Sequence, residues 1–572
     1  MPVSSVVAAL PTVMIFPAKS LVCAHAEMAP SKAKREARIS LIEFFIMLDL
    51  PFLFEYLGTK LTLLFYFSQS LQEIIAGNVK YQLFFTFWIV FEGKVLSLHS
   101  QPSIATIKSM VFNSFNFIIL YPFIFLLYYA IPAKHTKGRN LYLLLASYLL
   151  YAHWKPVYAL ILLAVTAVTF FSAKMIAKAT RPKRILTLGV LLTLLPLAFF
   201  KYFNFINDTL SEILPAGLNW AIPVGISFFT FQALGYLWDV YYKRQEAEHD
   251  FLTYALFISF FPSILAGPIN KASLVIPQLK SLRPYFDYGK AVEGLKMVLW
   301  GMFMKVVVAD RVGIYVDTVL PSYVNYTGLS CFMASILYTI QIYTDFAGYS
   351  LMAIGIGKTL GFELTENFRR PYFAVSVTDF WHRWHISLST WLKDYVYIPM
   401  GGSRCSKLRN YWNIFVTFLV SGIWHGANWT FIVWGCMHGV CQIVEKMLGQ
   451  QKCSYGWFGR SVKILVTFLI VNFAWLFFRM PSLSDACGVI ARIFNPSLPM
   501  TVFWGPINNL AFMVLGVAMV WAKDFRDEFA PERFLLMNSA SRGIRWLTYV
   551  LLLALILTAG VFGADQFIYA NF

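Results

Sequence analysis

Long apolar runs recur along this chain from near residue 40 to the C-terminus, and after Met110 they are separated regularly by short polar stretches. Each run approaches the roughly 20 residues that a helix needs to cross about 30 Å of hydrocarbon. Backbone groups in lipid must be satisfied within the segment, so the runs predict helices. The pattern therefore predicts an all-α integral membrane protein with about 11–13 transmembrane helices. The predicted spans are about 112–131, 140–153, 157–173, 185–204, 221–240, 251–266, 292–309, 329–348, 411–427, 429–447, 463–478, 508–522 and 545–563.

The polar stretches between the first runs alternate in charge. Those at 132–139 and 174–184 are basic, 242–250 carries Lys243 and Arg244 beside three acidic residues, and the stretch with Asp208 and Glu212 is acidic. Lysine and arginine accumulate in the cytoplasmic loops of membrane proteins. Counted by lysine and arginine, the alternation therefore places 132–139, 174–184 and 242–250 in the cytoplasm and the beginning of the first span outside.

Residues 1–109 have a different pattern. Their apolar pieces lack regular spacing, and an early one ends in CAHAE, which imitates a signal peptide without its basic N-terminal region. Met110 then opens a segment that has the character of a natural start. We predict that 1–109 result from a misassigned translation start and that 110–572 form one membrane domain. The alternative is a genuine extension with one to three membrane-associated helices.

Composition supports the membrane assignment and excludes other classes. The 572 residues are 58% hydrophobic and 13% charged, whereas soluble domains are about 45–50% apolar and about 25% charged. The net charge is +18, but the positive residues lie in short loops, so nucleic-acid binding is not predicted. The seven cysteines show no CxxC or regular spacing, so neither a zinc site nor a disulfide framework is predicted.

Two blocks interrupt the apolar pattern, and the first is TDFWHRWHISLSTWLKDYVYIPMGGSR at 378–404. At about 100° per residue it predicts an amphipathic helix that lies along an interface or lines a cavity. His385 falls at the edge of the apolar stripe, where a side chain can be both buried and reactive. The stripe contains Phe380, Trp384, Leu388, Trp391 and Tyr395. The opposite side carries Asp379, Arg383, Lys393 and Asp394.

The second block is VSGIWHGANWTFIVWGCMHG at 420–439. An ionisable residue at membrane depth is costly and marks a candidate functional site. A neutral imidazole can accept a proton from a hydroxyl near neutral pH. The block therefore makes His425 a candidate general base. Its other polar or aromatic residues in apolar surroundings are Trp424, Asn428, Trp429 and His438.

Each of these residues also has a structural interpretation. A buried histidine among aromatic rings is often a packed core residue. For His438 we predict this supporting role in helix packing. Asp379 and Arg383 have the spacing of an ion pair across one helical turn. His382 and His385 could share a metal ion, but no nearby set of further ligands supports a metal site. The residues alone leave an enzyme and a transporter open, whereas a structural scaffold does not explain imidazoles in apolar helices.

At these residues the chain resembles the membrane-bound O-acyltransferase family. The bacterial branch that it resembles contains alginate O-acetyltransferase, peptidoglycan O-acetyltransferase and the D-alanyl transfer protein of teichoic acid synthesis. The resemblance covers about 110–480 and extends more loosely to the C-terminus. Besides the two histidine blocks, it rests on MVFNSFNFIILYPFIFLLYY at 110–129, PVGISFFTFQALGYLWDVYY at 223–242, FFPSILAGPI at 260–269 and QIYTDFAGYSLMAIGIGKTLGFELTENFRRPY at 341–372.

The resemblance implies two functional histidines in a tunnel that crosses the protein. The WHG string places the catalytic one at His425, as general base. The RWHIS string places the second at His385, which would position or polarise a reactant. Asn428 and Trp424 would shape the pocket, and the family's aspartate position falls on Asp379. The remaining candidates for support of the substrate tunnel are Trp384, Arg383 and His438.

The resemblance also implies the reaction and its partners. An acyl group, acetyl in the simplest case, would move from a cytoplasmic thioester, acyl-CoA or an acyl carrier, to hydroxyls of an extracytoplasmic polysaccharide or to an acyl-relay partner. No bound cofactor or metal is implied. A separate extracytoplasmic protein of the SGNH or esterase-like kind is an expected partner, beside membrane lipid and the glycan acceptor. The implied location is the inner membrane of a bacterium.

Two observations limit these expectations. GPINKAS has Asn270 and Lys271 where the branch often has a charged pair, and Leu351 stands where an acidic residue is common, which leaves the acceptor open. The alternative function is a transporter or flippase of a lipid-linked glycan, with the histidines as a proton relay. Transporters often contain internal repeats, and the sequence shows none.

Overall fold

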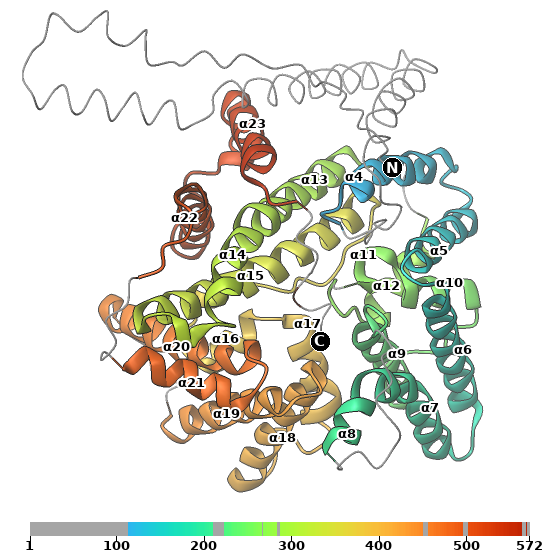
Figure 1. Ribbon diagram of the computed structural model, residues 1–572. Coiled ribbons are helices and arrows are strands. Elements are labelled where there is room, and N and C mark those ends of the chain that lie inside the picture. Colours follow the sequence, from blue (N-terminus) through green and yellow to red (C-terminus); the bar gives the residue numbers. More distant parts are fainter. Residues whose placement is uncertain are drawn as a thin grey trace, which may run out of the picture. The chain divides into compact units, whose positions relative to one another are not determined.

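The computed structural model describes residues 112–209, 222–265, 267–282, 286–449, 456–495, 502–562 and residue 568. The chain divides after Ile107 into two units, and every described residue belongs to the second. The predictions for 1–109 therefore lie outside the described residues and remain predictions. Within these ranges the regular elements are helices and no strand is present, which confirms the all-α class (Figure 1).

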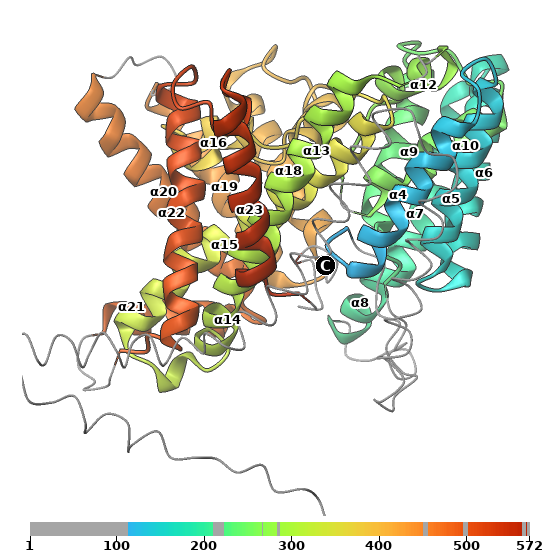
Figure 2. The same cartoon turned by 90° about the horizontal axis from the view of Figure 1, so that it is seen from above.

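The first group of helices includes α6 and α7, which pack side by side and against α9 (Figures 1 and 2). Proline starts α6 and α7, at a position where its missing N–H is not needed. A Cβ on Gly189 of α7 would lie 2.9 Å from Ser172 Oγ, so glycine allows α7 to approach α6 closely. The group consists of α4 (Phe115–Ala130), α5 (Thr136–Ala152), α6 (Pro156–Lys178), α7 (Pro182–Leu197), the π-helix η3 (Ala198–Tyr202) and α8 (Phe203–Thr209).

Helix α9 is buried along nearly its whole length, although it carries polar side chains. These side chains have partners: Gln232 donates to the Phe257 carbonyl at 2.6 Å, and Asp239 accepts from the Tyr395 hydroxyl at 2.8 Å. Buried polar groups need such bonds, so α9 is fixed in position at the centre of the fold. Its group consists of α9 (Ile226–Tyr241), α10 (Phe251–Ser259), α11 (Phe261–Ile264) and α12 (Ala272–Lys280).

Helices α13 and α15 cross at two pairs of glycines. A Cβ on Gly294 would lie 2.5 Å from the Gly355 carbonyl oxygen, and a Cβ on Gly301 would lie 2.5 Å from that of Gly348. Small residues of this kind let helix backbones approach closely in a membrane. The elements of this region are α13 (Tyr288–Met302), the π-helix η4 (Phe303–Ala309), α14 (Asp310–Val319), the 3-10 helix η5 (Tyr323–Asn325) and α15 (Gly328–Thr359).

A buried ion cluster joins η4 to α14 and α15. Lys305 Nζ lies 2.6 Å from Asp310 Oδ1 and 2.6 Å from Asp345 Oδ1, and all three side chains are buried. The backbone N–H of Ile568 donates to Asp345 Oδ2 at 2.8 Å. A buried charge is tolerated when it is paired and hydrogen-bonded, so this lysine has its counter-ions within the fold.

Helices α18 and α19 form a tight hairpin. A Cβ on Gly422 would lie 2.4 Å from the Phe431 carbonyl oxygen, and one on Gly435 would lie 2.4 Å from that of Phe418. The elements up to the hairpin are the 3-10 helix η6 (Pro371–Phe373), α16 (Val377–Arg383), α17 (Ile386–Leu392), the π-helix η7 (Lys393–Tyr397), α18 (Lys407–His425) and α19 (Trp429–Met447). The last elements are α20 (Trp457–Arg479), α21 (Leu483–Phe494), α22 (Ile507–Phe529), the 3-10 helix η9 (Leu536–Asn538) and α23 (Arg542–Ala559).

The single amphipathic helix predicted within the block 378–404, ending in a turn at Pro399, Gly401 and Gly402, is wrong as one continuous helix, although the turn is present. It breaks after Arg383, because the Ile386 amide donates to the carbonyl of Asn367 at 3.0 Å instead of continuing the helical ladder. His385 in the break has a positive φ of 42°. The predicted stripe is nevertheless buried on both sides of the break: Phe380, Trp384, Leu388, Trp391 and Tyr395.

Every apolar run predicted after residue 110 coincides with one helix or with two or three consecutive helices. Four of the described helices are long and apolar enough to cross a membrane, and shorter apolar helices occur at Asn116–Ala130 and Phe251–Ile264. Figure 2 shows α6, α22 and α23 with their long axes in a similar direction. The four candidate spans are Pro156–Lys178, Pro182–Asn207, Trp457–Arg479 and Arg542–Ala559.

Candidate active site

His385 is held in the break between α16 and α17 by Asn367. Its Nδ1 lies 3.1 Å from Asn367 Oδ1, which also accepts the Ser387 hydroxyl at 2.9 Å. Asn367 Nδ2 donates in turn to Ser350 Oγ at 3.1 Å. Because Asn367 Oδ1 only accepts, this network assigns the proton of the imidazole to Nδ1 and the lone pair to Nε2.

His425 is the last residue of α18 and is buried among aromatic rings. Its ring centroid lies 4.9 Å from that of Trp424, 4.9 Å from that of Trp434 and 5.2 Å from that of Phe478. The Trp424 ring also contacts His385, with 6.0 Å between centroids. The two histidines, 40 positions apart in the sequence, are therefore brought to the same indole.

His438 and Trp384 belong to the packing around this pair. His438 Nδ1 accepts from the Trp381 indole N–H at 3.3 Å, and its ring lies 5.0 Å from that of Trp434. Trp384 is fully buried and lies 5.0 Å from Trp475, centroid to centroid. His382, in contrast, is exposed while His385 is buried, so the two do not face a common metal position.

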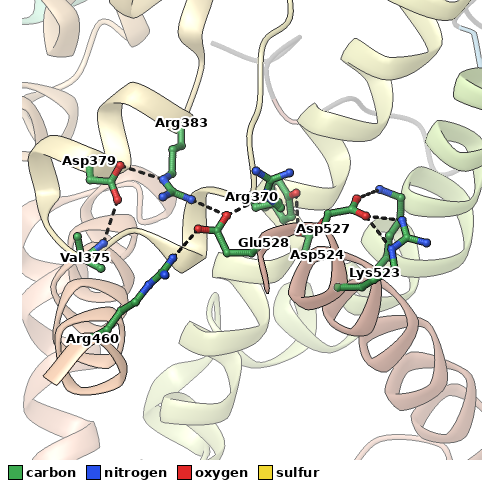
Figure 3. Close-up of polar contacts among 11 residues, drawn as sticks. Arg370, Val375, Asp379, Arg383, Arg460, Lys523, Asp524, Asp527 and Glu528 are labelled. Atoms are coloured by element: carbon green, nitrogen blue, oxygen red, sulfur yellow. Dashed lines mark hydrogen bonds and ion pairs between the residues drawn. The ribbon is translucent and has the colours of Figure 1, made fainter. Parts of the chain in front are cut away.

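Asp379 and Arg383 form hydrogen bonds within a charged cluster and not with the histidines (Figure 3). Asp379 Oδ1 accepts from Arg383 Nε at 2.9 Å, and its Oδ2 accepts from the Val375 amide at 3.1 Å. Arg383 also donates to Glu528 at 2.9 Å. The pair across one helical turn predicted from the sequence is thus present, as part of a larger network.

Glu528, in the charged last turn of α22, forms ion pairs with three arginines (Figure 3). Its carboxylate accepts from Arg370 and Arg383 at 2.9 Å each and from Arg460 at 2.8 Å. Burial alone raises the pKa of Glu528, but Arg383 and Arg370 outweigh burial and hold the pKa of this carboxyl below its usual range. The cluster therefore fixes α22 to α16, which precedes His385.

A wide cavity of about 800 Å³ adjoins the end of α18. It is lined by Gly426, the residue after His425, and by Asn428. Asn428 shapes the turn: its Oδ1 accepts from the Thr430 amide at 3.1 Å and its Nδ2 donates to the Pro481 carbonyl at 2.8 Å. The other lining residues are Lys201, Asn204, Phe205, Thr209, Ile222, Ala427, Trp429 and Phe431.

A narrow cavity of about 280 Å³ approaches from the other end of α9. It is lined by Ser387, whose hydroxyl lies 3.5 Å from His385 Nδ1. Its residues on α9 run from Phe231 to Asp239, whereas the wide cavity touches Ile222, just before the helix. The Phe231 ring lies 5.2 Å from that of Trp424, between centroids. The wide cavity thus reaches the residue after His425, and the narrow cavity reaches Ser387, which contacts His385; the two cavities lie toward different ends of α9.

Lys201 and Asn367 are site residues that the sequence did not single out. Lys201 Nζ donates to the Trp424 carbonyl at 2.6 Å and to Ser227 Oγ at 3.2 Å. A lysine within the apolar run 185–204 was the available signal for it. Asn367 carried no such signal, because an asparagine in a polar stretch is common.

The comparisons agree with the resemblance seen in the motifs. Residues 146–480 match the model of MBOAT, the membrane-bound O-acyltransferase family. A probable alginate O-acetylase, AlgI, of Pseudomonas aeruginosa is 38% identical over 398 residues, covering 68% of this chain and 75% of the relative. A peptidoglycan O-acetyltransferase of Helicobacter pylori is 36% identical over 429 residues, covering 69% and 81%. A teichoic acid D-alanyltransferase of Bacillus subtilis is 26% identical over 306 residues, covering 51% and 76%.

The family model spans more than half of the chain, and it includes both histidine blocks. Relatives above one third identity cover more than two thirds of the chain. Both observations confirm the family that the motifs suggested. This chain belongs to the membrane-bound O-acyltransferase family.

Proposed function

We propose that this protein transfers an acyl group, acetyl in the simplest case, from a cytoplasmic thioester to hydroxyls of an extracytoplasmic polysaccharide or to an acyl-relay partner. The observation that carries the proposal is the pair of cavities toward different ends of α9, one lined by Gly426 beside His425 and the other by Ser387 beside His385. The relatives support the reaction class, since their names describe transfer to alginate and to peptidoglycan.

The charge pattern assigns a side of the membrane to each cavity. The loop 242–250, which contains Lys243 and Arg244, follows α9 directly, at the end where Asp239 lines the narrow cavity, and this loop is predicted to be cytoplasmic. The narrow cavity would therefore admit the donor, and the wide cavity would face outside and admit the acceptor. Acyl-CoA and an acyl carrier both present the thioester on a slender chain, which suits the smaller cavity.

In the proposed reaction His425 accepts the proton of the acceptor hydroxyl while the hydroxyl oxygen attacks the thioester carbonyl. The C–O bond forms, the C–S bond breaks, and the leaving thiolate takes up the proton from His425. The products are an ester and a free thiol. A positioned imidazole contributes typically about 10²–10⁴-fold to such a step.

His385 would act from the side of the narrow cavity. Asn367 holds its Nδ1–H, so the ring presents a fixed orientation to a donor beside Ser387. Trp424 would form the shared wall between the reactants, and Asn428 and Gly426 would shape the acceptor side. Asp379, Arg383, Trp384 and His438 would act by supporting this geometry.

The proposed setting is the inner membrane of a bacterium, with a multi-pass topology. Where the acyl group goes first to a relay partner, that partner would be a separate extracytoplasmic protein of the SGNH or esterase-like kind. It would meet the enzyme at the mouth of the wide cavity.

The test is the amount of ester-linked acyl group on the glycans of cells that express the wild type, His425→Ala or His382→Ala at equal protein level. We expect His425→Ala to lower the ester content by about 10²–10⁴-fold with normal membrane insertion. His382→Ala is the matched control, because this histidine is exposed on the same segment as His385. It should leave the ester content unchanged.

Isolated vesicles separate this function from transport of a lipid-linked glycan. An acyltransferase forms ester and thiol without net movement of glycan across the membrane. Glycan movement that depends on His425, with ester content unchanged, would replace the proposed function with transport.

A further inference from the structure

Lys201 is a buried lysine that the proposed reaction does not use. It lies in the π-helix η3, within the candidate membrane span Pro182–Asn207, and only 6% of it is exposed. Short π-helical segments inside α-helices occur frequently at functional sites. A lysine in a membrane span is costly and generally marks a function.

The contacts of Lys201 connect it to both histidines through Trp424. Its ammonium donates to the Trp424 carbonyl at 2.6 Å and lies 5.7 Å from the centre of the Trp424 ring. Trp424 precedes His425 in the chain and contacts the ring of His385. A group bound at this ammonium would therefore lie next to the proposed reaction centre.

Among the described residues, Lys201 has no counter-ion. Its recorded partners are the Trp424 carbonyl and the Ser227 hydroxyl, which are neutral, and no carboxylate of the described residues lies within 4.0 Å of Nζ. Lys305, the other deeply buried lysine discussed above, has two carboxylates at 2.6 Å. Buried charges are normally paired, so the difference singles out Lys201.

The space beside Lys201 is large enough for a ligand to provide the missing charge. Lys201 lines the wide cavity of about 800 Å³, within the size range of small-molecule sites. An ammonium has three N–H donors. Among the described residues, two of them are used by the Trp424 carbonyl and the Ser227 hydroxyl, so the third can donate to a ligand.

We propose that Lys201 binds a carboxylate of the acyl acceptor, so that the wide cavity selects an acidic sugar over a neutral one. This inference rests on the proposed function, because it assigns the wide cavity to the acceptor. The carboxylate pairs with the ammonium, and a hydroxyl of the same glycan unit is thereby held near His425. Lys201 is then a specificity-determining residue of the acceptor site.

The test measures binding to the full-length protein in lipid nanodiscs by titration calorimetry. The probes are a short oligomer of uronic acid and the same oligomer with its carboxyl groups reduced to alcohols. Lys201→Gln keeps an N–H donor for the Trp424 carbonyl and removes the charge, whereas Lys201→Arg keeps the charge. Lys183→Gln is the matched control, since Lys183 is exposed in the first turn of α7.

We expect Lys201→Gln to weaken binding of the uronate oligomer about tenfold or more, as for loss of a charged hydrogen bond. Binding of the neutral oligomer should stay at the wild-type level in this variant. Lys201→Arg and Lys183→Gln should retain preference for the acidic oligomer. Because the readout is binding, His425→Ala should retain the preference as well, even though it transfers no acyl group.

Two results would overturn the inference. Equal binding of acidic and neutral oligomers by the wild type would show that the cavity does not recognise a carboxylate. An equal loss for both oligomers in Lys201→Gln would show that Lys201 only holds Trp424. The failure of the proposed function would look different, because ester formation would then survive in His425→Ala while the binding preference remained as it was.

Discussion

His385 has a backbone conformation that residues with a Cβ rarely adopt. Its φ is 42°, in the left-handed region. Such conformations cost about 1–3 kcal/mol and cluster at active sites. Asn367 holds both the backbone after His385 and the imidazole itself. Its backbone carbonyl accepts from the Ile386 amide at 3.0 Å, and its Oδ1 lies 3.1 Å from Nδ1 of His385. Asn367 is therefore a positioning residue for His385.

We expect Asn367→Leu to lower kcat of acyl transfer by about a hundredfold with little change in KM for the donor. The side chain keeps its size but no longer orients His385, and a misplacement of 1 Å can have an effect of this order. Steady-state kinetics on purified protein provide the measurement. Ser350→Ala is the control, because it removes only the partner of Asn367 Nδ2 and should retain wild-type kcat. An equal loss in both variants would indicate general damage to the packing.

At this scale, short strings in the sequence identified candidate residues that the structure brings together. His425 and Trp424 are neighbours, and the structure brings His385 to the same indole. Lys201 and Asn367 were not predicted, because their proposed roles depend on contacts with Trp424 and His385, which lie 223 and 18 positions away in the sequence. Such partners become visible only when the helices are packed.

At the scale of helices, the contact between α13 and α15 depends on glycine. A Cβ on Gly301 would lie 2.5 Å from the Gly348 carbonyl oxygen and 2.9 Å from Met352 Cγ. Real Cβ atoms do not approach a carbonyl so closely, and neither backbone can yield without separating the helices. Since α15 carries Asp345, a shift here would also disturb the pairing of Lys305.

We therefore expect Gly301→Leu to destabilise the protein by at least about 1–3 kcal/mol, the usual effect of overpacking. The measurement is the thermal unfolding midpoint in detergent. Gly138→Ala is the control, because its added Cβ would meet only His135 and Ile131 at 3.7 Å in helix α5. A midpoint for Gly301→Leu equal to that of the control would contradict the close packing.

Helix positions were largely predictable because apolar runs of sufficient length can form only helices in lipid. The break at His385 was not, because the apolar periodicity continues across it from Phe380 to Tyr395. Short elements between the runs were also missed, since they lack a long apolar run. These are α12, α14 and α21.

At the scale of the whole described unit, the cluster around Glu528 joins distant parts of the chain (Figure 3). Glu528 lies 145 positions from Arg383 and 158 from Arg370, and it fixes the C-terminal α22 to the segment that carries His385. The sequence pattern could not predict which arginines bind Glu528, because this glutamate is one of several charged residues at the end of α22. The family resemblance likewise contains no information on it.

The lowered pKa of Glu528 makes part of the stability depend on pH. A carboxyl with a depressed folded pKa stabilises the fold above its unfolded pKa, about 4.3 for glutamate, and this contribution is lost as pH falls through the folded value. We expect Glu528→Gln to lower the unfolding midpoint at pH 7 and to approach the wild type as the pH falls below about 4.

Unfolding midpoints over a pH series provide this measurement. Glu366→Gln is the matched control, because Glu366 pairs with Arg369 at the surface with more than half of each side chain exposed, and exposed pairs contribute little. A constant difference between Glu528→Gln and wild type at every pH would rule out the titration of Glu528 as the cause.

The proposed use of two separate cavities has a consequence for the order of events in turnover. If donor and acceptor enter through different cavities, they do not compete for one space, so both can be bound before either reacts. A base that only moves a proton needs no acylated enzyme between two half-reactions. The initial-rate lines for donor and acceptor should therefore intersect, as in a ternary-complex enzyme, and a molecule lodged in one cavity should leave binding in the other intact.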